Sequence, residues 1–96
     1  MKYIRRAMKG AEYLDKKLGT KSWRKKIDKD RLDLQMPCDC ILGQLYLDYY
    51  EGTHNLGITD YGRTAQRMGF CFEWDPGEGQ DHRYQELTEA WKEVLK

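Results

Sequence analysis

Three cysteines and one histidine come closest to the composition of a metal site. Cys38, Cys40, His54 and Cys71 together make a nominal Cys3His zinc set. Zinc sites favour paired ligands with about two to four residues between them, whereas a single residue separates Cys38 from Cys40. If both cysteines are helical, their side chains point about 200° apart and cannot hold one ion or form a disulfide. We therefore expect no metal, and reduced cysteines that serve as small hydrophobes.

The sequence contains no recognisable nucleophilic site. Ser22 is the only serine and lacks the glycine elbow of a hydrolase. His54 and His82 occupy a predicted loop and a predicted helix start, where a solvated histidine is the simpler interpretation. Cys40 with His54 could form a thiolate and its base, but their spacing does not favour it. Since a phosphate loop and a dinucleotide fingerprint are also missing, we expect no enzyme and no cofactor.

The strongest chemical signal is a group of cations around a tryptophan. The first 31 residues carry 12 of the 17 Lys and Arg but 4 of the 16 acids, so they hold about +8 against about −7 for the rest. Trp23 is followed directly by Arg24, Lys25 and Lys26. Cations beside an aromatic face can hold a phosphate while the ring stacks on a base. These four residues are our candidate ligand-binding set.

Simpler alternatives to such a site stay open. Trp23 could pack into the core, and the cations could face water or pair with the acidic part, within the chain or across an oligomer interface. The formal net charge of +1 and the 16 acids disfavour binding of duplex nucleic acid. A small anionic ligand or an acidic patch on a protein fits better.

The elements that carry these residues can be predicted from apolar spacing. Apolar residues recur every three or four positions across residues 2–18, which predicts a helix ended by Gly19. Its predicted core stripe consists of Ile4, Ala7, Met8, Ala11, Leu14 and Leu18. Ser22 is a candidate cap for a short helical turn, and residues 28–34 look like an extended connector. Pro37 suits the start of a second helix that reaches Tyr50 and closes at Gly52.

This second helix would be apolar on nearly all sides, which makes it the central element of the fold or an interface. Cys38, Ile41, Leu42, Leu45 and Tyr49 form one stripe. The opposite side defines a candidate homo-oligomer interface, where a glycine permits close backbone approach: Cys40, Gly43, Leu47 and Tyr50.

Residues 53–96, nearly half of the chain, predict two more helices. Residues 53–55 look like a loop, Thr59 like the N-cap of a short helix, and Gly69 like its end. Alternating Phe70, Phe72 and Trp74 indicate a short extended aromatic segment, and residues 75–81 a mobile turn. A last helix is predicted over residues 82–95. The expected fold is all-α: one small domain, residues 1–96, of four to five helices around the central apolar helix.

Sequence features also bear on the compartment. The apolar stretch over residues 41–47 is far shorter than the ~20 residues of a membrane span. We see no secretory signal, so we expect no membrane association and a cytoplasmic protein.

The central octet, C-D-C-I-L-G-Q-L at residues 38–45, resembles small uncharacterised proteins of bacteriophages and Gram-positive bacteria. Other pieces fit the same pattern: Trp23, Ile27-Asp28, Leu32-Asp33-Leu34, Leu56-Gly57, Gly69-Phe70 and L-T-E-A-W at residues 87–91. The resemblance carries no activity, but it implies a phage or prophage origin. Phage proteins of this size often bind a host protein or sequester a host signalling molecule.

Together these observations predict a non-enzymatic binding protein, oligomeric, of a phage accessory type that engages a host protein in the host cytoplasm. The alternative is a sponge for a nucleotide-like signal, with Trp23 stacking on the base and Arg24, Lys25 and Lys26 holding phosphate.

Overall fold

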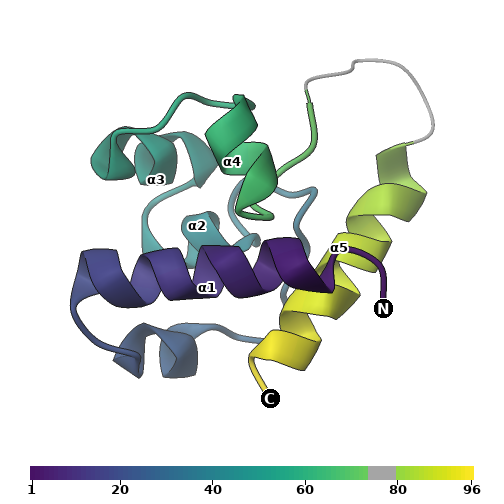
Figure 1. Ribbon diagram of the computed structural model, residues 1–96, viewed down its shortest axis with the longest axis horizontal. Helices are drawn as coiled ribbons and strands as arrows, with labels where there is room; N and C mark the ends of the chain where they lie inside the picture. The colour runs from purple at the N-terminus through teal and green to yellow at the C-terminus, as the bar shows by residue number, and fades with distance from the viewer. Residues whose placement is uncertain (74–79) are drawn as a thin grey trace.

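The computed structural model (Figure 1) describes residues 1–73 and 80–96. Its elements, in chain order, are α1 (Ile4–Leu18), the 3-10 helix η1 (Ser22–Lys26), α2 (Ile41–Leu45), α3 (Tyr49–Leu56), α4 (Arg63–Arg67) and α5 (Gln80–Val94). The described residues contain no strand. The predicted all-α class is confirmed.

Helix α1 crosses α5, and small residues allow the close crossing seen in Figure 1. The buried stripe of α1 consists of Ala7, Gly10, Ala11 and Leu14, which recur at three and four residues. A Cβ at Gly10 would lie 2.0 Å from the Met68 carbonyl oxygen and 2.7 Å from Cζ2 of Trp91. Gly10 therefore lies at the closest approach of α1 to α5, whereas Met8 stays 48% exposed. Gly19, with φ 69°, ends the helix as predicted.

The predicted helix over residues 37–50 is wrong, because the chain folds there as two short helices. Cys40 is extended and caps α2, its thiol accepting a hydrogen bond from the backbone N–H of Gly43 at 3.2 Å. The backbone is extended again at Tyr46 and Asp48. The Asp48 carboxylate then accepts from the N–H of Glu51 at 2.9 Å and so begins α3. In the part of the chain that the structure describes, no single apolar helix occupies the centre of the fold.

Gly52 does not close a helix, and residues 53–55 are not a loop, because both lie inside α3. Gly52 instead lets α3 approach α2, since a Cβ there would stand 2.7 Å from the Cβ of Leu42. Helix α3 ends at Gly57, whose φ of 72° is left-handed. The N-cap of α4 is Gly62 rather than the predicted Thr59. Gly69, with φ 69°, comes directly after Met68, the C-cap of α4, and so lies one residue beyond the cap rather than at the end of the helix.

The aromatic segment is buried coil where it is described. Phe70, Cys71 and Phe72 are all at most 2% exposed, so their side chains do not alternate between core and solvent. Backbone groups here bond to α5: the Trp91 indole N–H donates to the Gly69 carbonyl at 2.6 Å, and the Phe72 N–H donates to the Tyr84 hydroxyl at 3.0 Å. Trp74 and most of the predicted turn, residues 75–79, lie outside the described residues. The turn's last two residues, 80 and 81, belong to α5.

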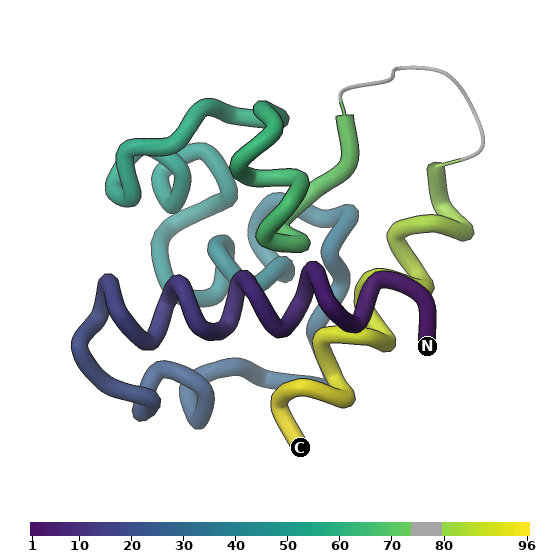
Figure 2. The backbone as a smooth tube through the Cα atoms, viewed as in Figure 1, coloured from purple at the N-terminus to yellow at the C-terminus, as the bar shows by residue number. Residues whose placement is uncertain are grey.

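The tube in Figure 2 shows that η1 and the end of α5 lie on the same side of α1. The connector from residue 28 to residue 34 runs on from η1 and buries Leu32 and Leu34. It is not extended throughout as expected, because residues 29–31 form a turn in which the Arg31 N–H donates to the Asp28 carbonyl at 3.2 Å. Within the described residues, every helix is too short or too polar to cross a bilayer.

Candidate functional site

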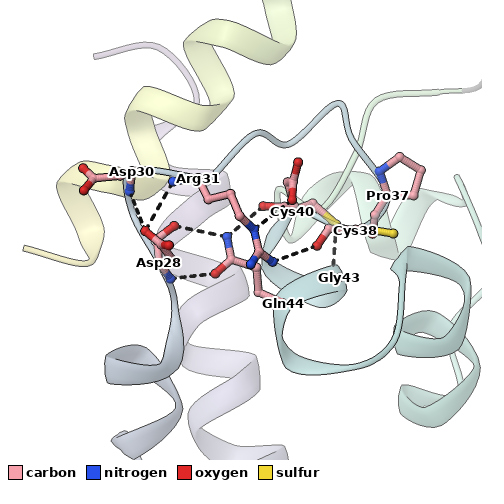
Figure 3. Close-up of polar contacts among 9 residues, drawn as sticks. Asp28, Asp30, Arg31, Pro37, Cys38, Cys40, Gly43 and Gln44 are labelled. Carbon is pink, nitrogen blue, oxygen red and sulfur yellow. Dashed lines mark hydrogen bonds and ion pairs between the residues drawn. The ribbon is translucent and has the colours of Figure 1, made fainter.

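The buried thiols are poor nucleophiles. Cys40 is 1% exposed, and burial raises its pKa to about 11. Its thiol donates to the Pro37 carbonyl at 3.6 Å while it caps α2, so it has a structural role (Figure 3). The pKa of Cys71 is also raised by burial, and its sulfur accepts a hydrogen bond from the Tyr49 hydroxyl at 3.2 Å. Both thiols stay protonated near neutral pH.

The nominal zinc set is dispersed. Cys38 lies exposed in the turn before α2, Cys40 and Cys71 are buried, and His54 is exposed on α3. Cys38 and Cys40 are not helical, so the angle of about 200° expected between their side chains does not apply. The two side chains differ in exposure because Cys40 turns inward to cap α2. Across residues 1–73 and 80–96, no three His, Cys, Asp or Glu side chains are grouped to hold a metal ion.

Trp23 cannot stack on a ligand, which corrects the predicted role of its ring. The side chain is 2% exposed, and its indole N–H donates to Oδ1 of Asp15 at 2.8 Å. Arg24 holds the same carboxylate through two contacts, at 3.3 Å from Nε and 2.8 Å from a terminal nitrogen. Desolvation opposes ionisation of Asp15, but these hydrogen bonds prevail and lower its pKa. Trp23, Arg24 and Asp15 thus fasten η1 to α1.

A second set of contacts, drawn in Figure 3, fixes the chain that leaves η1. The Gln44 side chain accepts from the Asp28 N–H at 2.6 Å and donates to the carbonyls of Asp28 and Asp39 at 3.2 and 3.0 Å. Arg31 donates to the Asp39 carboxylate at 2.9 Å and to the Cys38 carbonyl at 3.3 Å. These bonds anchor the connector to α2 and to the turn before it.

A groove lined by cations opens between η1 and the end of α5. Its volume is about 510 Å³. Ile27, Val94 and Leu95 supply its apolar surface. Five cationic side chains line it: Lys21, Arg24, Lys25, Lys29 and Lys96. We call this hollow the basic end of the groove.

A second hollow, of about 370 Å³, lies between α1 and α5. Arg24 and Val94 line both hollows, so the two adjoin there, and we refer to them together as the groove. The other lining residues are Ile4, Met8, Ala11, Glu12 and Glu93. We call this part the apolar end.

Of the predicted ligand-binding residues, Arg24 and Lys25 line the groove. Trp23 lies buried beside it, and Lys26, although exposed, is not among the lining residues. Sequence reasoning missed the wall contributed by α5, Val94 to Lys96, because no local spacing indicates which distant helix packs beside η1. It also missed Met8, whose helical periodicity placed it in the core stripe.

Half of the predicted oligomer interface is internal to the chain, which corrects that prediction. Cys40 is buried, and the close backbone approach at Gly43 is intramolecular: a Cβ there would meet the Pro37 carbonyl oxygen at 2.1 Å. Leu47 and Tyr50 are exposed, by 82% and 44%. Contact between copies of the chain through these two residues stays a prediction.

Comparison of the chain with protein-family models, with curated proteins and with solved structures returns no match.

Proposed function

We propose that this chain is a non-enzymatic binding protein whose groove engages an acidic surface of a partner protein. Lys21, Lys25 and Lys29 carry the proposal: all three are exposed, line the basic end, and make no ion pair within the described part of the chain. The charges of Arg24 and Lys96 are offset by Asp15 and Glu93. Three exposed lysines without an ion-pair partner in the described residues, over an apolar floor, suit carboxylates carried on a polypeptide.

A protein partner is better supported than a nucleotide. The described groove lining has no aromatic side chain on which a base could stack, and Trp23 is enclosed. Glu12 and Glu93 line the other end, where they would repel phosphate. The raised thiol pKa values further support binding rather than catalysis. With the phage resemblance, we propose a phage-type accessory protein that engages a host protein in the host cytoplasm.

The test compares the protein with a Lys21→Glu, Lys25→Glu, Lys29→Glu variant in capture from a Gram-positive host extract. We expect the unaltered protein to retain a host protein that the triple variant does not retain. The purified partner should then bind more weakly as salt rises, since the contacts are solvent-accessible charges. Retention of the same proteins by both forms would contradict the proposal. So would native mass spectrometry that finds a nucleotide bound to the purified chain, which would favour the sponge.

A further inference from the structure

The groove changes chemical character along its length. At the apolar end, the side chains of Ile4, Met8 and Val94 are only partly covered, and Met8 is 48% exposed. A methionine with several rotatable bonds adapts its shape to an apolar partner. At the basic end the accessible groups are lysines. A purely acidic ligand would leave the apolar end unfilled.

Charge also differs between the ends. The apolar end carries Glu12, which has no ion-pair partner in the described residues, and Glu93, which pairs with Lys96 at 2.9 Å. Arg24 stands at the junction and is held by Asp15 at 2.8 Å, with 28% of its side chain exposed. The carboxylates of a ligand are therefore attracted to one end and repelled from the other.

We propose that the groove takes one segment of a partner chain in which aliphatic side chains directly adjoin a run of Asp and Glu. The aliphatic part occupies the end lined by Ile4, Met8 and Val94, and the carboxylates face Lys21, Lys25 and Lys29. This inference rests on the proposed function and adds the order of residues in the recognised segment. Because Arg24 and Val94 line both hollows, the two sites adjoin, and a single segment that crosses Arg24 and Val94 reaches both. Each hollow has the roughly 300–1,000 Å³ of a small-ligand site.

The test uses three synthetic peptides: an aliphatic block followed by an acidic block, the same composition with the residues interleaved, and the acidic block alone. Binding is measured by fluorescence anisotropy with the full chain. We expect the block peptide to bind at least tenfold tighter than the interleaved one. Met8→Glu should abolish that preference while binding of the acidic block persists, and Lys25→Glu should weaken all three peptides.

Met36→Glu is the matched control, since Met36 is 49% exposed and does not line the groove. Met36→Glu should leave the affinities of all three peptides unchanged. If Met8→Glu folds poorly, Met8→Gln repeats the test with an uncharged side chain. Equal binding of block and interleaved peptides, with Lys25→Glu still weakening both, would overturn this inference but leave the proposed function standing. Failure of all three peptides to bind would overturn both.

Discussion

Gly43 shows how one residue fixes the shape of the centre of the chain. A methyl group there would lie 2.1 Å from the Pro37 carbonyl oxygen and 2.8 Å from the carbonyl carbon of Cys38. Both atoms belong to backbone, so neither can move away as a flexible side chain would. The turn that precedes α2 folds against this glycine, and it holds Cys40 where its thiol caps the helix.

Gly43→Ala should therefore lower the free energy of unfolding by about 3 kcal/mol, the upper part of the range for overpacking. Gly19→Ala is the control, because its Cβ would meet no atom within 4 Å and its cost is confined to the left-handed φ of 69°. That cost is about 1 kcal/mol. Urea denaturation measures both variants, and equal losses would contradict the close approach at Gly43.

The thiols give a second prediction at this scale. Cys38 is exposed, whereas burial raises the pKa of Cys40 to about 11 and also raises that of Cys71. N-ethylmaleimide at neutral pH should label Cys38 rapidly in the folded protein and the other two only after unfolding. Mass spectrometry of peptides locates the label. Labelling of Cys40 at the rate of Cys38 would reopen the thiolate hypothesis.

At the scale of elements, Asp15 joins η1 to α1 and thereby holds the basic end of the groove in place. Its folded pKa is lowered from the ordinary value of 3.8, because hydrogen bonds from Arg24 and Trp23 outweigh desolvation. A carboxyl with a depressed pKa stabilises the fold above its unfolded pKa, and that contribution is lost as the pH falls through the folded pKa.

We therefore expect Asp15→Asn to be less stable than the unaltered protein at pH 7, with the difference shrinking as the pH falls below about 3.8 and lost only below the lower folded pKa of Asp15. Thermal melts across this pH range measure it. Glu12→Gln, on the exposed face of the same helix, is the control and should change stability little. A stability difference that persists unchanged at acidic pH would show that the ionised carboxylate of Asp15 is not the source of the stabilisation.

The elements also show what could be predicted from the sequence. The two long helices, α1 and α5, have apolar residues at every third or fourth position, and their predicted bounds are within two residues of those observed. The region of α2 and α3 was mispredicted because its continuous apolar pattern hides two breaks. Cys40 and Asp48 make those breaks through side-chain caps, and Gly52 packs inside a helix rather than ending it.

The groove was only half predictable for a related reason. The cations after Trp23 are evident in the sequence, but the direction in which the indole turns depends on Asp15, eight residues earlier. The opposite wall comes from residues about 70 positions away, so only tertiary packing brings Val94 to Lys96 beside η1. Charge composition therefore located one side of the site and could not show its shape.

For the whole molecule, a substitution at Leu47 tests the predicted association of copies. Leu47 is 82% exposed in the segment between α2 and α3. If copies associate through it, Leu47→Asp should convert an oligomer to a monomer, as measured by sedimentation velocity. The fold should persist, because the side chain buries little surface within its own chain. An identical mass for both proteins would contradict association through this face.

We propose that the groove between α1, η1 and α5 is the binding surface of the protein. The most direct measurement is a nuclear magnetic resonance titration of the isotope-labelled chain with the peptide that joins an aliphatic to an acidic block. The account predicts that the largest amide shifts fall at Lys21, Lys25, Lys29 and Val94, and that they shrink as salt is added. Shifts centred instead on Leu47 and Tyr50, or none at all, would contradict it.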